Sequence, residues 1–220
     1  MTLDEIRRLL QPLGIRWWLQ GGGLITMYRD NYLKSTLDWD MGIFAEDLSP
    51  TVIKKIQKSG LYIRNFWKGP KDQKIGFSTV NPNLINELQE LDNWDHSQGL
   101  DFYCFYKDTK LKKYYYSEYP YWDDNNENLF RCYHTPFDID YYNYEGFDVP
   151  IPSNTELFLE ETYGEDWRVP VDGPVWIYEY PCSVETTYKK TKDYTNNFIG
   201  VLNVLNRNIG FENKTSGKLK

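Results

Sequence analysis

The chain has 220 residues, of which 40% are hydrophobic and 17% aromatic, and this suits one domain with a sizeable core. Such a composition excludes a disordered chain, and a net charge of −7 argues against nucleic acid as a partner. No apolar run approaches the roughly 20 residues of a membrane helix, so we expect no integral membrane segment. The three cysteines form no CxxC pair, which argues against a disulfide framework and favours a cytoplasmic location.

Apolar spacing, caps and breakers predict helices and strands that alternate in the first half of the chain. The predicted elements are a helix over 2–13, a strand over 15–20, a helix over 22–29, a strand over 36–45, a helix over 50–58, strands over 61–67 and 74–80, a short helix over 83–91 and a strand over 100–106. Short strands and long loops follow over 113–150, then a helix over 154–163, and helix again from Ser183 to about Leu205.

This order of elements favours an α+β fold with a mixed β-sheet flanked by helices. We expect one catalytic domain over residues 1–170. Residues 171–220 are expected to form a C-terminal extension, largely helical, that packs on the same domain and frays at its end.

A run of glycines, Gly21, Gly22 and Gly23, lies between the strand predicted over 15–20 and the helix after it. The N-terminus of a helix presents unpaired N–H groups and the positive end of the helix dipole, so it binds phosphate readily. Glycine turns between a strand and a helix are also common for purely structural reasons. We therefore predict that these three glycines bind the phosphates of a substrate, with a structural turn as the alternative.

Two acids, Asp38 and Asp40, stand two residues apart in the strand predicted next. Side chains at i and i+2 of a strand share a face, about 7 Å apart. Two such carboxylates aimed together repel by roughly 3 kcal/mol at about 5 Å and an effective dielectric near 20. A divalent cation would remove this cost, although Asp-x-Asp also occurs by chance in acidic chains. Asp101 is the single internal acid of a later strand.

Taken together, five segments resemble the LicD family, whose members include bacterial phosphorylcholine transferases and the fukutin-related protein. The family pattern is Gly-small-Leu-Leu-Gly-x-x-Arg, eight residues, Asp-x-Asp, a strand of the type hydrophobic-Asp-hydrophobic-Phe, and a Pro-rich lead into a helix that ends Tyr-Gly-x-Asp-Trp. The matching segments here are 22–29, 38–40, 100–102, 149–152 and 163–167. Eight residues separate Arg29 from Asp38, as in the family, and the match runs from about residue 3 to 170.

The resemblance implies a nucleotidyltransferase-like fold that moves a phospho-alcohol (phosphocholine, ribitol phosphate or glycerol phosphate) from a CDP-alcohol donor to a glycan acceptor. On this reading Asp38 and Asp40 hold Mg²⁺ or Mn²⁺ against the donor diphosphate. Asp101 is the third carboxylate, either a metal ligand or the base for the acceptor hydroxyl. Arg29 neutralises a phosphate, and the alternative for Arg29 is a structural ion pair with Asp30.

Four positions depart from the family pattern: Gly23 stands where a small Thr is common, Thr26 at the second glycine, Asp30 where a basic residue or His often follows the arginine, and Thr36 where an acid often precedes Asp-x-Asp. The identity of the donor is therefore open. One alternative is a nucleotidyltransferase that attaches NMP to a small molecule or a protein. Another is a non-catalytic glycan-binding module, because the chain has nineteen tyrosines and Tyr rings stack well on sugars.

Overall fold

The described residues of the computed structural model are 2–33, 39–59, 62–68, 74–80, 99–118, 128–171 and 179–187. The chain divides into two units, Met1–Lys189 and Lys190–Lys220, and all described residues belong to the first. None of the helices in this described part is long and apolar enough to cross a membrane.

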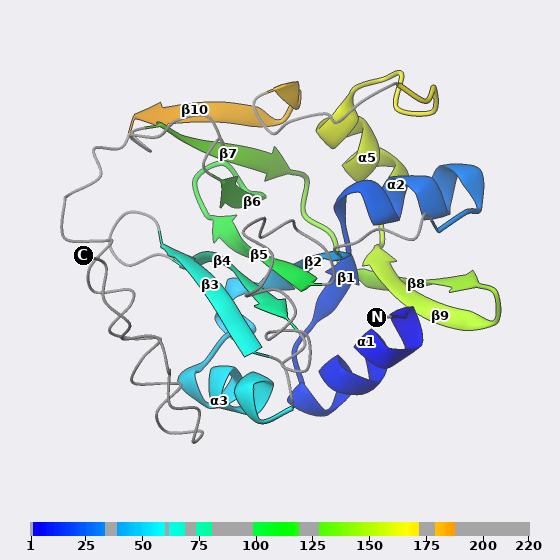
Figure 1. Ribbon diagram of the computed structural model, residues 1–220. Helices are drawn as coiled ribbons and strands as arrows, with labels where there is room; N and C mark the ends of the chain where they lie inside the picture. The colour runs from blue at the N-terminus through cyan, green and yellow to red at the C-terminus, as the bar shows by residue number, and fades with distance from the viewer. Residues whose placement is uncertain are drawn as a thin grey trace, which may run out of the picture. The chain divides into compact units, whose positions relative to one another are not determined.

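The first unit is α+β, with helices before and between the described strands (Figure 1). The α-helices are α1 (Leu3–Leu10), α2 (Gly21–Asp30), α3 (Pro50–Lys58) and α5 (Thr155–Tyr163), with 3₁₀ turns at Gln11–Leu13 and Ala45–Asp47. The strands are β1 (Trp17–Leu19), β2 (Trp39–Phe44), β3 (Tyr62–Lys68), β4 (Lys74–Val80), β5 (Gly99–Asp108), β6 (Lys113–Glu118), β7 (Asn128–His134), β8 (Ile139–Tyr144), β9 (Phe147–Pro152) and β10 (Ser183–Thr187).

Helix boundaries follow local signals in the sequence. Thr2 begins α1 through a capping box with Glu5, and Gly14 ends the following 3₁₀ turn in the left-handed conformation, with φ 68°. Ser49 caps α3, whose first residue is proline. Gly164 follows α5 and donates its N–H to the carbonyl of Glu160. The predicted helices over 2–13, 22–29, 50–58 and 154–163 are thereby confirmed.

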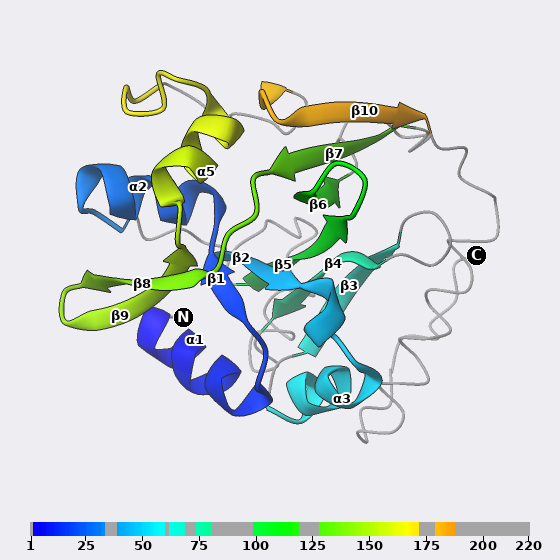
Figure 2. The same cartoon turned by 180° about the vertical axis from the view of Figure 1, so that it is seen from behind.

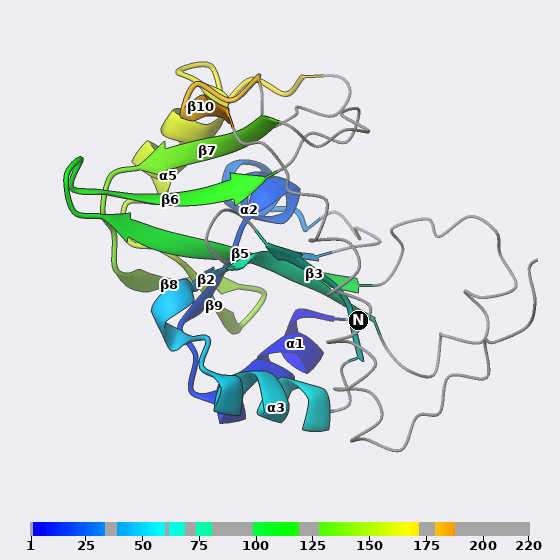
Figure 3. The ribbon, with the colours of Figure 1, turned by 90° about the vertical axis from the view of Figure 1, so that its left-hand side faces the viewer.

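The sheet is mixed, with the strand order β1-β2-β5-β6-β7-β10, and β4 also pairs with β5 and carries β3. Only the pairing of β2 with β5 is parallel among these; the other pairings are antiparallel. Seen from the side, β5, β6, β7 and β10 follow one another along this sheet (Figure 3). The hairpin of β8 and β9 forms a separate two-stranded sheet that contacts β1. The predicted α+β class with a mixed sheet and flanking helices is confirmed.

An aromatic core fills the space behind β1 and β2. The ring of Trp18 contacts the rings of Phe44, Phe105 and Phe137 at centroid distances of 4.8–5.0 Å, and all four side chains are buried. Gly42 is required there, because a Cβ at this position would fall inside the indole ring of Trp18. Viewed from behind, α2 and α5 lie near one end of β1 and α1 and α3 near its other end (Figure 2).

Two expectations about the C-terminal half of the chain are wrong, and a third, about residues 83–91, falls outside the described residues. Residues Ser183–Thr187 form strand β10 against β7 rather than the start of a helix. Cys132 and Cys182 are joined in a disulfide, although the odd number of cysteines argued against one; the third, Cys104, is buried and takes no part in this disulfide. The predicted helix over 83–91 lies outside the described residues.

Candidate active site

Two of the predicted acids lie side by side in the middle of the sheet. Asp40 of β2 and Asp101 of β5 are register partners on adjacent parallel strands, so their side chains project from the same face. Both are half-buried, whereas their strand neighbours Met41 and Phe102 are fully buried. Asp38, the other acid of the Asp-x-Asp pair, lies outside the described residues.

Gly21, the first residue of α2, rests directly against the carboxylate of Asp40. It has a left-handed backbone with φ 61°, and a Cβ on it would overlap Oδ2 of Asp40. The preceding residue binds the same strand, since the N–H of Gln20 donates to the carbonyl of Asp40 at 2.9 Å. A glycine is therefore needed here for two reasons, the positive φ and the close approach. The N-terminus of α2 is brought to the acids as the sequence predicted.

The other two predicted glycines have different surroundings. Gly22 is exposed and has open space where a Cβ would stand, while Gly23 is buried against the side chain of Leu19. Gly22 is therefore on the open side of the helix N-terminus and Gly23 on the packed side. Gln20, the N-cap, makes no side-chain capping bond, and its buried Oε1 has no hydrogen-bond partner in the described part of the chain. A buried acceptor of this kind fits a ligand donor or a hard cation.

A third carboxylate, Glu118 at the end of β6, joins these acids. Burial, together with the negative charge of Asp101, raises the pKa of Glu118 to about 8. A carboxyl group with such a pKa can hold or release a proton near neutral pH. The sequence reasoning missed Glu118 because it ends a Tyr-rich segment, Lys113–Glu118, in which no spacing marks it as a site residue.

Four tyrosines line the acids and keep their protons. The rings of Tyr103 and Tyr116 meet at 5.5 Å and those of Tyr163 and Tyr180 at 5.4 Å. Burial raises the pKa of each of the four phenols, and the charge of Asp40 raises it further. All four are thus neutral hydrogen-bond donors at physiological pH. The hydroxyl of Tyr180 is already engaged, because it donates a hydrogen bond to the oxygen of Tyr163.

Arg29 lies at the far end of α2, where it forms an ion pair with its neighbour. Its Nε donates to Asp30 Oδ1 at 2.7 Å and its Nη2 to Oδ2 at 2.8 Å, and Nη1 donates to the carbonyl of Trp167 at 3.3 Å. The hydrogen bonds that Arg29 donates to Asp30 raise the pKa of Arg29. Its charge also reaches the site, since it acts to lower the pKa of Tyr163. The geometry is that of the alternative foreseen for Arg29, and its predicted phosphate contact stays a prediction.

The donor set fits a hard divalent cation. Asp40, Asp101 and Glu118 supply carboxylate oxygens, which Mg²⁺ and Mn²⁺ prefer. Burial is the main cause of the raised pKa of Glu118 and the charge of Asp101 adds to it, so a cation beside these acids would favour their ionised forms. The residues present therefore suit the metal that the sequence predicted.

An open groove of about 460 Å³ runs beside α2, between the β8–β9 hairpin and the start of α5. Its rim carries three tyrosines, Tyr28, Tyr141 and Tyr142, and polar groups from Asp140 and Asn154. The rings of Tyr28 and Tyr142 lie 5.6 Å apart, and Tyr141 is 63% exposed. Tyr28 lies two helical turns from Gly21, so the groove and the acids lie at opposite ends of α2.

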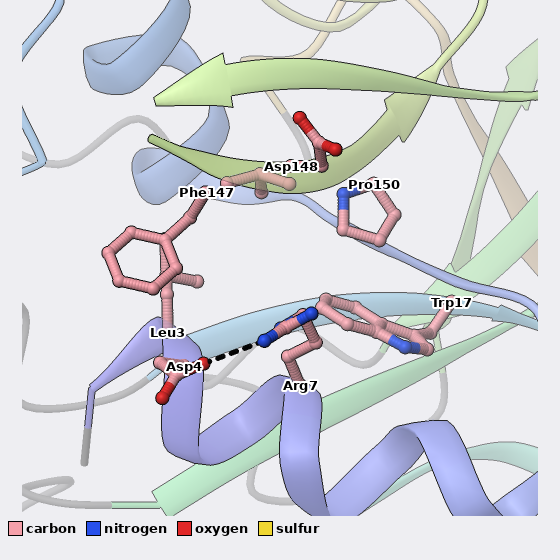
Figure 4. A pocket seen from close by; sticks show the side chains of 8 residues that line it. Leu3, Asp4, Arg7, Trp17, Phe147, Asp148 and Pro150 are labelled. Carbon is pink, nitrogen blue, oxygen red and sulfur yellow. Dashed lines mark hydrogen bonds and ion pairs between the residues drawn. The ribbon is translucent and has the colours of Figure 1, made fainter. Parts of the chain in front are cut away.

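A second hollow, between α1 and β9, is too small for a substrate. Its volume is about 10 Å³, close to the smallest space that holds a water molecule. Arg7 reaches back to Asp4 at 3.0 Å on one side, and Trp17 and Pro150 lie on the other (Figure 4). This hollow is a small gap where α1 packs on β9, and it is not a binding site.

Comparison with known proteins agrees with the predicted family. No family model matches the chain. In sequence, it is 24% identical over 179 residues to the ribitol-5-phosphate transferase FKTN of Homo sapiens and of Macaca fascicularis, and 22% identical to that of Mus musculus. The chain is a distant homologue of fukutin. The alignments cover 79% of the chain and 34% of each fukutin, so the chain spans about a third of the length of these relatives.

Two solved structures are also similar to this chain. One is the lincomycin-bound lincosamide antibiotic adenylyltransferase LnuA, with a TM-score of 0.45 and 15% identity over 73% of this chain and 84% of that one. The other is the antibiotic-resistance factor ANT(2″)-Ia, with a TM-score of 0.43 and 15% identity over 94% of this chain and 90% of that one.

Proposed function

We propose that this chain is a metal-dependent transferase that moves a phospho-alcohol from a CDP-alcohol donor to a glycan hydroxyl. The observation that carries the proposal is the placement of Gly21 against Asp40, with Asp101 beside Asp40 on the next strand. It sets an anion-binding helix N-terminus next to oxygen ligands for a cation, as transfer of a phosphorylated group requires. The distant homology to ribitol-5-phosphate transferases supports a phospho-alcohol as the transferred group.

In the proposed site, Asp40 and Asp101, with Asp38 two positions before Asp40 in the sequence, would hold Mg²⁺ or Mn²⁺. The bound cation supplies charge neutralisation for the diphosphate of the donor. The N–H groups at the start of α2 bind the phosphate from its other side. Asp101 or Glu118 takes the proton of the acceptor hydroxyl, and Glu118 suits this role because its pKa of about 8 lies near the working pH.

We place the glycan acceptor in the groove beside α2. Sugar rings stack on the faces of exposed tyrosines, and Asp140 and Asn154 offer hydrogen-bond partners for hydroxyls. Tyr141→Ala should raise the KM for the acceptor and leave the KM for the donor unchanged. Leu111→Ala is a matched control, because Leu111 is similarly exposed, at 58%, and lies outside this groove.

The proposal is tested by thermal shift with Mg²⁺ and a panel of CDP-ribitol, CDP-glycerol and CDP-choline. A ligand that binds only the folded state raises stability by about 2.7 kcal/mol at a hundred times its Kd, so the true donor raises the Tm most. The stabilisation should require Mg²⁺ and disappear in Asp40→Asn. No shift with any CDP-alcohol in the presence of metal would refute the donor class.

The same panel separates the alternatives. A nucleotidyltransferase would transfer NMP from labelled CTP or ATP to an acceptor, whereas the proposed enzyme releases CMP from a CDP-alcohol. A non-catalytic glycan-binding module would bind glycan equally well with and without EDTA, and no CDP-alcohol would stabilise it.

A further inference from the structure

A second cluster of potential ligands lies outside the proposed site, between β7, β10 and α5. Its members are Cys132 and His134 on β7 and Cys182 just before β10, and their ligand atoms all lie within 4.8 Å of one another. Cys132 and His134 are fully buried, and Cys182 is 9% exposed. The two sulfurs are bonded to each other in the structure, and Cys132 Sγ lies 3.3 Å from His134 Nε2.

The imidazole of His134 is fixed as the imidazole of a metal ligand usually is. Its Nε2 faces the sulfurs, while its Nδ1 faces Glu161 Oε2 at 3.7 Å. Metal-bound histidines commonly turn their second nitrogen towards a carboxylate; here the separation is longer than a hydrogen bond, and Nδ1 has no hydrogen-bond partner in the described residues. The ring is held between flat neighbours, since it stacks on Phe158 at 4.1 Å and lies parallel to Tyr116.

Glu161 is itself held in place by three groups other than the histidine. It accepts hydrogen bonds from the backbone N–H and the hydroxyl of Thr135, both at 2.8 Å, and Lys113 Nζ stands 3.6 Å away. The carboxylate therefore keeps its position whether or not the sulfurs are bonded. Burial lowers the pKa of His134, so the ring is neutral near pH 7, and its Nε2 is a lone-pair donor when Nδ1 carries the hydrogen.

We propose that, once the disulfide is reduced, Cys132, His134 and Cys182 form a zinc site. Two thiolates and one imidazole are the soft donors that Zn²⁺ prefers over Mg²⁺, and three protein ligands leave the fourth position for water or an added ligand. Zinc–ligand distances of about 2.0–2.3 Å require the sulfurs to separate and the imidazole to approach Cys182 by roughly 1 Å. Reduction permits this movement because it frees both cysteine side chains.

The two states are linked by a balanced exchange. A dithiol reductant transfers two electrons and two protons to the disulfide, giving two thiols and an oxidised reductant. Zn²⁺ then binds both sulfurs and releases these two protons to solvent. A reducing compartment, which the cysteine count led us to expect, would favour the zinc form, and an oxidising compartment would favour the disulfide.

Zinc titration of the full chain with and without a dithiol reductant tests the proposal. Reduced protein should bind one Zn²⁺ at this cluster, and Co²⁺ in its place should give a thiolate charge-transfer band; oxidised protein should give neither. Cys182→Ser should weaken zinc binding more than about a hundredfold, and Glu161→Gln, which keeps all three ligands, should weaken it by about 10–100-fold. Cys104→Ala is the matched control and should bind as the wild type does.

The titration is made in the Asp40→Asn background, so that zinc at the carboxylates is not counted. Equal zinc affinity of reduced and oxidised protein, or a Co²⁺ complex without the thiolate band, would overturn the proposal. If Cys182→Ser fails to fold, the comparison of reduced with oxidised protein and the Glu161→Gln variant still decide it.

Discussion

Two glutamates in this chain experience opposite electrostatic environments. Glu118, beside Asp101, has its pKa raised to about 8 by burial and by the neighbouring negative charge. Burial acts on Glu161 in the same direction, but hydrogen bonds from His134 and Thr135 outweigh it and hold the pKa at about 2. The carboxylate cluster therefore gains from a hard cation that removes repulsion, whereas the cluster around Glu161 is balanced internally and offers soft ligands. On the two proposals made above, one sheet would carry two sites that select different metals.

The largest expected effect concerns the second cluster. The Cys132–Cys182 disulfide spans 50 residues, and closing a loop of that length stabilises the fold by about 4 kcal/mol through the unfolded state. Reduction in the absence of metal should therefore lower the free energy of unfolding by about this amount in urea titrations. Adding Zn²⁺ to the reduced protein should restore part of it, while Mg²⁺ should not. An unchanged urea midpoint on reduction would show that the bond does not constrain the chain.

Removal of an acid from the first cluster should have the next largest effect. Asp40→Asn should lower kcat/KM for transfer by more than about a hundredfold, since even the outer partners of metal ligands are worth 10–100-fold. The fold should persist, because the change removes a repelling charge rather than a packing contact. Steady-state kinetics and urea unfolding measure the two quantities. Retained turnover would refute the role of Asp40 as a metal ligand.

A matched pair of glycine substitutions tests how α2 meets the acids. Gly21→Ala places a Cβ on the Asp40 carboxylate and forces alanine into a left-handed backbone, which costs about 1–2 kcal/mol of stability. The KM for the donor should rise as well, because the helix N-terminus must move away from Asp40. Gly22→Ala meets open space and should stabilise the helix by up to about 1 kcal/mol. If the two variants had the same stability and the same KM for the donor, the N-terminus of α2 would not be part of the site.

Much of the fold could be predicted because its signals are local. Caps at Thr2 and Ser49 and glycines at Gly14 and Gly164 define helix ends without reference to the rest of the chain. The α+β class followed from the order of these elements. The start of β10 was mistaken for helix, because its strand character comes from pairing with β7, some 50 residues away.

The sequence predicts only those site residues that lie close to one another along the chain or belong to a family motif. The approach of the glycine turn to Asp40 was expected from the strand-turn-helix pattern, and Asp101 from the family resemblance. Glu118 reaches the acids because β6 folds back antiparallel on β5, and the two cysteines meet because β10 pairs with β7, some 50 residues away; no spacing reveals either approach. The odd cysteine count was misleading because the third cysteine, Cys104, is buried and lies outside the disulfide.

The smallest expected effect is a pair of opposite pH dependences of stability, which solvent and salt partly screen. In metal-free protein, folded Glu118 keeps its proton up to about pH 8, while the unfolded chain loses it near 4.5. The contribution of Glu118 to stability is therefore complete below pH 4.5 and is lost as the pH rises towards 8. Glu118→Gln should remove this decline in urea midpoints, and Mg²⁺ should flatten it in the wild type.

Glu161 should give the reverse trend, since its folded pKa of about 2 lies below the unfolded value of 4.5. Its contribution is present above pH 4.5 and is lost as the pH falls towards 2, so Glu161→Gln should reduce the loss of stability in acid. Urea midpoints measured over a range of pH should show the two changes on opposite sides: Glu118→Gln should alter the profile above pH 4.5, and Glu161→Gln should alter it below pH 4.5. If both changed the same side of the profile, the two carboxylates would share one environment, and the distinction between a cation-requiring cluster and a self-balanced one would fail.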